Sequence, residues 1–346
     1  MEGKKFRFTT VNTGRAVLIS LLLTSSAAEA QLSYTVTPNN TVTITGYTGG
    51  WPMSQTGVII PATTNGLPVT SIGDGAFSGY EGLPSVTIPA GVTNIGLGAF
   101  GICSNLVSVT IPDGVLSIGD GAFENCVQLP NISIPGSVNY LGVSAFSRCY
   151  HLTNLTIGDG VPCISSNAFY FCHGLHSIVI PASVTNIGDS AFSECDMTNI
   201  VILGSDISIG SLGFYDSDRL AGVYFAGNAP VADVSVFSIF PGPSYVATIY
   251  YLPGSTGWSP TFAGVPATSW NPAIKASGPD FGLQGGQFGF DITGNAGLTV
   301  MIQACTNLAN PVWTPLQTAT LTGGVYHFSE PFQPNAPARY YGLGFP

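Results

Sequence analysis

Apolar and polar positions recur along the middle of this chain with a fixed spacing. An Ala-Phe or Gly-Phe pair, usually preceded by Ile-Gly, occurs seven times, and cysteine follows three residues later in five of the copies. Its phenylalanines stand 23 residues apart over five consecutive intervals and 22 apart in the last: Phe77, Phe100, Phe123, Phe146, Phe169, Phe192 and Phe214. A fixed period in this range is typical of a solenoid, in which each repeat forms one coil.

Each repeat unit contains a stretch in which apolar and polar residues alternate. Leu106, Val109 and Ile111 give the spacing L-x-x-V-x-I, whose alternating tail predicts a strand with one buried face. A second short extended piece and a glycine-rich corner complete the unit. Burial of about eight apolar side chains per coil contributes roughly 1.5 to 3 kcal/mol each, whereas ordering the coil costs about 1.5 kcal/mol per residue. The coils must therefore stack, about 4.8 Å apart, into a rod.

The repeat I-P-x-x-V-T-x-I-G-x-x-A-F-x-x-C-x-x-L-x-x-V-x recurs in register over about residues 60–225. In these residues the chain resembles the BspA-like leucine-rich repeats of bacterial secreted and surface proteins. The resemblance implies a leucine-rich repeat solenoid and protein–protein interaction or adhesion at the cell surface, with host matrix proteins as partners in some members. The fourth unit departs most from the pattern, with Gly158 in place of proline and Pro162-Cys163 in the Val-Thr strand.

Segments on both sides of the repeats are interpreted as caps. Residues 31–59 alternate around the turn Pro38-Asn39-Asn40, which predicts a hairpin over the apolar edge of the first coil. Residues 226–270 lose the period and are interpreted as the C-terminal cap, with Trp258 and Trp270 over the final edge.

The C-terminal part of the chain has a different pattern. Residues 271–280 contain prolines, a lysine and glycine without periodicity and are interpreted as a linker. Short alternating stretches in residues 281–346, separated by turn signals at about ten-residue spacing, predict a small antiparallel β-sandwich. The predicted fold class is therefore mainly β: a leucine-rich repeat solenoid of 23-residue coils with capping segments, followed by this small C-terminal sandwich.

The N-terminal residues have the three parts of a secretory signal peptide. Lysines and arginines precede an apolar run over residues 16–23, and small residues follow and end in Ala28-Glu29-Ala30. This order predicts cleavage after Ala30 and a secreted chain, extracellular or associated with the cell envelope. A membrane anchor is the alternative, but the apolar run is far shorter than the ~20 residues that a span needs. No later stretch is long enough either, so no transmembrane segment is predicted.

The net negative charge of the chain bears on whether nucleic acid can be its partner. Only 8% of the residues are charged, and removal of residues 1–30 leaves four basic residues against sixteen acidic ones, a net charge of about −12 with histidine neutral. A chain this acidic cannot neutralise a phosphate backbone, so nucleic acid is not expected as a partner.

Five cysteines recur at one repeat position: Cys103, Cys126, Cys149, Cys172 and Cys195. Equivalent Cβ atoms on neighbouring coils would lie about 5 Å apart, wider than the ~3.8 Å that a disulfide prefers. A column of buried apolar thiols is the favoured interpretation, and zinc is disfavoured because a column gives a line rather than a tetrahedron. Pairing of Cys163 with Cys305 stays open.

No other motif predicts a cofactor, a metal site or a catalytic residue. Residues 96–101 satisfy G-x-G-x-x-G, but they lie at a repeat corner and not before a long helix, so nucleotide binding is not predicted. Asp74, Asp120 and Asp189 share one position just before Gly-Ala-Phe or its equivalent, where a carboxylate can cap exposed backbone amides. A calcium ladder would require an acid in every coil, which the sequence lacks.

The outward strand positions are the first candidate for binding, because solenoids usually bind partners on this concave face. They are polar and almost uncharged, and offer hydroxyls and amides for hydrogen bonding; a soluble β surface without a binding role is the alternative. The candidate concave-face residues are Ser108, Thr110, Asn131, Ser133, Asn154 and Thr156.

An irregular patch around the fourth unit is the second candidate. Alignment by cysteine places Arg148 beside Phe171 and Tyr150 beside His173 on successive coils. Exposed aromatic rings with a cation are common anchors at protein interfaces, although local packing explains single aromatics equally well. Three of the four histidines lie here, but no catalytic motif accompanies them, so the protein is predicted not to be an enzyme. The candidate binding residues are Arg148, Tyr150, His151, Tyr170, Phe171 and His173.

Three functions follow from these patterns. The leading prediction is a secreted, non-enzymatic binding or adhesion protein whose repeats bind an extracellular protein. A rival assigns binding of a glycan to the C-terminal module, with the repeats as a spacer. A structural envelope protein that assembles with itself is the third. The residues that could stack on sugars are Trp313, Tyr326, Phe328, Tyr340 and Tyr341.

Overall fold

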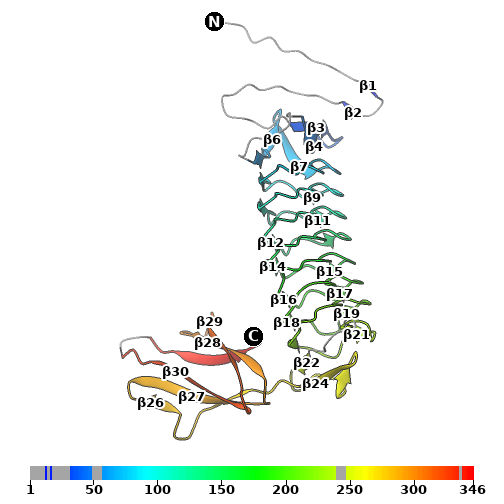
Figure 1. Ribbon diagram of the computed structural model, residues 1–346. Coiled ribbons are helices and arrows are strands. Elements are labelled where there is room, and N and C mark those ends of the chain that lie inside the picture. Colours follow the sequence, from blue (N-terminus) through cyan, green and yellow to red (C-terminus); the bar gives the residue numbers. More distant parts are fainter. Residues whose placement is uncertain (1–11, 14–15, 18–31, 49–56, 239–246, 335–336) are drawn as a thin grey trace.

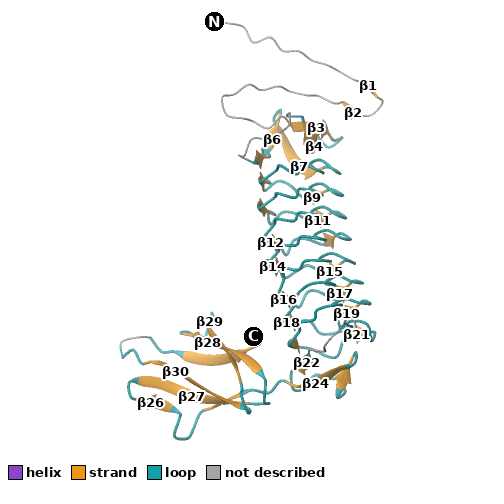
Figure 2. Cartoon of the chain, in the orientation of Figure 1, coloured by secondary structure: helices purple, strands orange, loops and turns teal. Residues whose placement is uncertain are grey.

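The computed structural model describes residues 12–13, 16–17, 32–48, 57–238, 247–334 and 337–346. In these ranges every regular element is a β-strand (Figure 2). The predicted signal peptide, residues 1–30, lies outside them except for β1 (Asn12–Thr13) and β2 (Ala16–Val17), which pair antiparallel. The remaining strands form a long rod of stacked coils with a small module beside its C-terminal end (Figure 1).

One strand of each coil contributes to a parallel array along the rod, here called the first ladder. Its strands are β5 (Val58–Ile59), β8 (Ser85–Thr87), β10 (Ser108–Thr110), β12 (Asn131–Ile134), β14 (Asn154–Ile157), β16 (Ser177–Ile180), β18 (Asn199–Ile202), β20 (Gly222–Phe225), β22 (Thr248–Tyr251) and β24 (Val265–Ser269). Equivalent residues of neighbouring coils lie in register, as Ser108 and Ser85 do. Side chains alternate between buried and exposed, as in β12, which confirms the predicted strand with one buried face.

A second ladder runs along another side of the rod. Its strands are β7 (Leu67–Ile72), β9 (Asn94–Ile95), β11 (Ser117–Ile118), β13 (Tyr140–Leu141), β15 (Cys163–Ile164), β17 (Asn186–Ile187), β19 (Ser208–Ile209) and β21 (Val231–Ala232). Glycine follows the isoleucine in most of these coils because the backbones approach closely there. A Cβ atom at Gly119 would lie 2.6 Å from the backbone nitrogen of Leu97 on the preceding coil.

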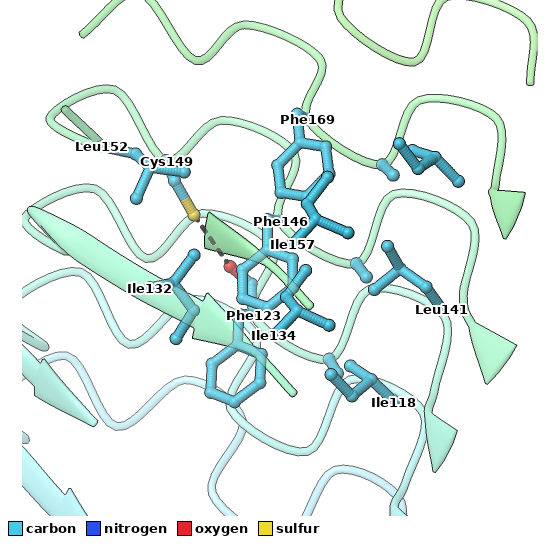
Figure 3. Packing of buried hydrophobic residues seen from close by; sticks show 14 of the residues in the cluster. Ile118, Phe123, Ile132, Ile134, Leu141, Phe146, Cys149, Leu152, Ile157 and Phe169 are labelled. Atoms are coloured by element: carbon cyan, nitrogen blue, oxygen red, sulfur yellow. Dashed lines mark hydrogen bonds between the residues drawn. The ribbon is translucent and has the colours of Figure 1, made fainter. Parts of the chain in front are cut away.

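Aromatic rings form the centre of the rod. Neighbouring phenylalanine rings of the repeat lie nearly parallel, with centroids 5.0 to 5.7 Å apart, and other apolar side chains fill the space around them (Figure 3). The column runs from Phe77 to Phe237, so it includes one ring more than the sequence pattern identified. Phe237 lies 23 residues after Phe214, inside the segment in which the period was interpreted as lost.

The N-terminal end of the second ladder carries an antiparallel hairpin of β3 (Leu32–Val36) and β4 (Val42–Tyr47), as the alternation predicted. Strand β4 then pairs in parallel with β7 of the first coil. The first repeat is longer than the others because β6 (Thr63–Thr64) folds back on β7 as a second small hairpin.

The C-terminal end of the first ladder carries β23 (Thr261–Phe262), which pairs antiparallel with β24. Trp258 packs here against Phe225 and stacks on Tyr251, with ring centroids 5.0 and 4.8 Å apart. Trp270 does not cover this edge, contrary to the prediction. It follows β24 and packs on Phe345 of the module, with centroids 4.7 Å apart.

The C-terminal module, residues 273–346, has two antiparallel sheets. In the first sheet β27 (Gln287–Thr293) pairs with β25 (Ala273–Lys275) and β26 (Gly282–Gln284) along one edge and with β30 (Val325–Pro331) along the other. In the second, β28 (Thr299–Cys305) lies between β29 (Thr314–Thr320) and β31 (Tyr340–Gly344). Because β25 belongs to this sheet, part of the segment interpreted as a linker is structured.

Candidate functional site

Side chains of two successive coils meet at the corner that leads from the second ladder to the first. We call this surface the corner surface; it consists of Arg148, Tyr150, His151, Tyr170, Phe171 and His173. Tyr150 stacks on His173, with ring centroids 5.9 Å apart and an angle of 16° between the planes. Phe171 contacts His173 edge to face at 5.3 Å and Tyr170 at 4.4 Å. The structure therefore brings the aromatic candidate residues together as one continuous cluster.

The backbone of each coil holds the corner side chains outward. The residue before each repeat cysteine has a positive φ, 61° at Arg148 and 60° at Phe171, a region that asparagine tolerates better than bulky residues do. Asn125 occupies the same position one coil earlier. The amide of Arg148 donates to the carbonyl oxygen of Tyr170, at 2.7 Å, and that of Phe171 to Ser193, at 3.0 Å. These bonds fix the spacing between the corner residues of adjacent coils.

Arg148 and the two histidines of the corner surface have partners on neighbouring coils. A guanidinium nitrogen of Arg148 lies 3.6 Å from a carboxylate oxygen of Glu124. His173 Nδ1 lies 3.7 Å from Asp196 Oδ1. His151 Nδ1 lies 2.9 Å from the carbonyl oxygen of Val127, so the ring nitrogen is the donor in that contact. These contacts restrict Arg148, His151 and His173 to positions beside the aromatic rings.

The candidate concave-face residues are all exposed on the first ladder. Ser108 and Thr110 lie on β10, Asn131 and Ser133 on β12, and Asn154 and Thr156 on β14. Asn154 Nδ2 donates to Asn131 Oδ1 at 2.6 Å, so two of these amides bind each other across the coils. The surface is a regular array of hydroxyl and amide groups.

The repeated cysteines and aspartates have structural roles. Each cysteine of the column is buried, and its thiol donates to the carbonyl oxygen of the phenylalanine 26 residues earlier at 3.1 to 3.4 Å, as Cys149 does to Phe123 (Figure 3). Burial raises the pKa of the thiols, for Cys103 to about 12. Asp120 Oδ1 accepts from the amide of Val143 at 2.8 Å. The predicted amide capping is present, but the capped amide belongs to the next coil.

Comparison with protein families identifies the repeats. The model of the BspA type leucine-rich repeat region matches residues 56–173 and 145–239, with six copies, and so extends over more than half of the chain. The chain belongs to the BspA-type leucine-rich repeat family. No curated protein matches it.

Solved structures of bacterial leucine-rich repeat proteins are similar to this BspA-type chain. A leucine-rich repeat protein of T. pallidum is 33% identical with a TM-score of 0.50, over 57% of this chain and 90% of that one. A leucine-rich cell surface protein of Faecalibacterium prausnitzii is 28% identical with a TM-score of 0.43, over 64% of this chain and 73% of that one.

The repeat pattern did not predict one contact surface of this BspA-type rod. Along the first ladder, the outward column changes from threonine and serine to Val179, Val201, Tyr224 and Tyr250. Val179 is 51% exposed, whereas the last three are 4%, 1% and 7% exposed because the C-terminal module covers them. Figure 1 shows the module beside this end of the rod, on the side of the first ladder.

The contact between rod and module is mainly aromatic. Tyr224 stacks on Tyr250 with centroids 5.1 Å apart and meets Phe345 of the module at 5.5 Å. The ring of Tyr224 lies over Gly222, where a Cβ atom would come within 2.8 Å of it. Asn295 Nδ2 adds a hydrogen bond of 3.1 Å to the carbonyl oxygen of Ser269. The apolar end of the concave face is therefore occupied within the same molecule.

The residues proposed to stack on sugars divide into two groups. Phe328 is buried in the core of the module, and the hydroxyl of Tyr326 accepts a hydrogen bond from Gln317. Trp313, Tyr340 and Tyr341 line one open hollow of about 340 Å³.

Within the described ranges no group of three His, Cys, Asp or Glu side chains is placed to hold a metal ion, and no helix has the length and hydropathy to cross a membrane.

Proposed function

We propose that this protein is a secreted, non-enzymatic binding protein that recognises an extracellular protein through the corner surface. Membership of the BspA-type family supports a repeat-based role in protein interaction. The signal-peptide pattern of residues 1–30 supports export, and the cell surface protein among the similar structures is consistent with a place outside the cytoplasm. Attachment to a host or to another cell would then be the biological result of binding.

One observation carries the choice of the corner surface. Tyr150, Tyr170 and Phe171 are in contact with His173 or with each other on two successive coils, whereas the coil of Phe123 holds Val127, Glu124 and Asn125 at these repeat positions. Aromatic residues dominate the binding energy of protein interfaces because they bury much area at low entropic cost. Stacking of the coils does not require aromatic residues at these positions, since the coil of Phe123 stacks without them.

The test uses substitutions that restore residues found at the same repeat positions elsewhere in the rod. In the mature chain, Tyr150→Val copies Val127, Phe171→Asn copies Asn125, and His173→Ser copies Ser104. Each variant is screened with the native chain against immobilised extracellular proteins. Binding that is lost in the variants while thermal unfolding stays unchanged supports the proposal. Binding that survives all three substitutions places recognition elsewhere on the molecule.

Glycan binding by the C-terminal module is a second candidate, favoured by the hollow between its two sheets. Trp313 lies against Gly342, where a Cβ atom would come within 3.1 Å of the indole, so the glycine makes room for the ring beside Tyr340. Aromatic faces with Arg339 in the same lining suit a sugar ring with an apolar face and a hydroxyl edge. A glycan array with the native chain and Trp313→Ala tests this candidate: glycan retention that is equal in both rejects it.

A further inference from the structure

Acidic side chains follow the corner surface along the rod. The next two coils present Glu194 and Asp196, then Asp216 and Asp218, at the repeat positions that hold Arg148 and Tyr150, or Phe171 and His173, in the corner surface. We call these four carboxylates the acidic step. Arg219 is the basic residue that follows Asp218 in sequence. The aromatic rings therefore lie next to an excess of negative charge.

The two groups are physically continuous. The amide of Phe171 donates to the carbonyl oxygen of Ser193 at 3.0 Å, and that of Glu194 to Tyr215 at 2.8 Å, so the corner positions of these coils follow one another in register. Asp196 reaches back to His173 at 3.7 Å. Phe171 and Glu194 occupy the same position in adjacent coils and have φ values of 60° and 61°, so their side chains leave the backbone in the same direction.

Two carboxylates of the acidic step are not neutralised by a cation of their own. Partial burial, with hydrogen bonding and repulsion from Asp216, raises the pKa of Glu194. Like charges that share a site disfavour ionisation of both, and a cation placed between them relieves this repulsion. In the described part of the chain, the ion pairs of this region join Arg148 to Glu124 and His173 to Asp196, and neither includes Glu194 or Asp216.

We propose that the corner surface and the acidic step together bind an arginine side chain exposed on the partner protein. The guanidinium would lie over the ring of Phe171, beside Tyr170, and donate hydrogen bonds to Glu194 and Asp216. A planar guanidinium stacks on aromatic faces and pairs with carboxylates better than an ammonium does. The proposal rests on the proposed function, since it names the partner chemistry of the same surface.

Other occupants fit this surface less well. An acidic partner would meet the acidic step and the net negative charge of the chain, and like charges across an interface oppose association. A purely apolar partner would cover Glu194 and Asp216 without supplying donors, and desolvated charges without partners are costly. A cation with an apolar face satisfies both the rings and the carboxylates.

The experiment uses three synthetic decapeptides as probes: alternating Arg-Gly, Lys-Gly and Gln-Gly. Their affinity for the immobilised mature chain is measured by biolayer interferometry. We expect the Arg-Gly peptide to bind most tightly, and we expect Glu194→Gln/Asp216→Asn to weaken it about fivefold, since exposed charge pairs contribute modestly. Phe171→Asn should weaken it by a similar factor. The matched control is Asp113→Asn/Asp159→Asn, which removes the same charge from exposed residues at a different corner of the coil.

The outcomes separate this inference from the proposed function. Equal weakening by the control pair, or equal binding of the Gln-Gly peptide, overturns the arginine site. If Tyr150→Val and Phe171→Asn abolish binding of an extracellular protein while the carboxylate pair has no effect, the corner surface stands and the arginine site is wrong. If neither set of variants affects binding of that protein, both proposals are wrong.

Discussion

Substitution of Tyr224 by alanine tests whether the module is held by the apolar end of the concave face. The side chain is 1% exposed and is shared between the two parts of the molecule. Its ring stacks on Tyr250 within the rod and meets Phe345 of the module. We expect Tyr224→Ala to leave the coils folded and to shift the module towards an undocked state.

The magnitude follows from the buried area. A buried tyrosine removes about 200 Å² from water, which at about 25 cal/mol per Å² corresponds to about 5 kcal/mol. Roughly half of this burial is against the rod itself, because the ring lies over Gly222 and beside Tyr250. The docking equilibrium should therefore change by about 2.5 kcal/mol, or about 60-fold.

Small-angle X-ray scattering measures the separation of rod and module. Trp270, which packs on Phe345, is one of four tryptophans that contribute to the emission, and its exposure would change that emission. Undocking should increase the maximum dimension and shift the emission to longer wavelength. Tyr140→Ala is the matched control, because this tyrosine is exposed on the second ladder. Scattering and emission equal to those of the control would refute the reasoning.

Further predictions concern the column of rings, the thiols and the acidic step. In denaturant titrations, Phe146→Ala should lower the free energy of unfolding by about 3 to 5 kcal/mol, whereas Tyr140→Ala should lower it by less than about 1 kcal/mol. Equal losses in the two variants would contradict the claim that the buried column of rings stabilises the rod. In the native protein, Cys163 should react with a thiol reagent faster than the six buried thiols, and equal rates would contradict their burial. Because the pKa of Glu194 is raised in the folded state, ionisation of this carboxyl at pH 7 destabilises the fold, and Glu194→Gln should raise the melting temperature. This difference in melting temperature should vanish as the pH falls towards 4.5, the usual glutamate pKa. A difference that grows in acid would contradict the raised pKa.

The repeats could be predicted because their contacts follow the period. Residues that are 23 positions apart meet on neighbouring coils, so the spacing of Phe123 and Phe146 in the sequence also predicts that their rings stack. The same rule predicts that Tyr150 lies beside His173, and the structure confirms this contact. The corner contacts could therefore be predicted from the sequence, whereas the identity of a partner could not.

The docking of the module could not be predicted in this way. Tyr224 and Phe345 are separated by more than a hundred residues and belong to elements without a common period. On the first ladder, Tyr224 stands at an outward position, where the pattern indicates exposure, and its burial depends on a domain that the pattern does not describe. The available signal was the change from Thr156 to Val179, Val201 and Tyr224 along one column.

Because the coils are evenly spaced, the number of coils sets the distance between the two candidate binding regions. The corner surface lies on the coils around Tyr150 and His173, and the module is fixed near Tyr224. Gain or loss of one 23-residue unit between them would move the two regions apart or together by about 4.8 Å and leave every coil-to-coil contact intact. Duplication of repeats can thus adjust the reach of a protein of this kind in equal steps, without redesign of either region.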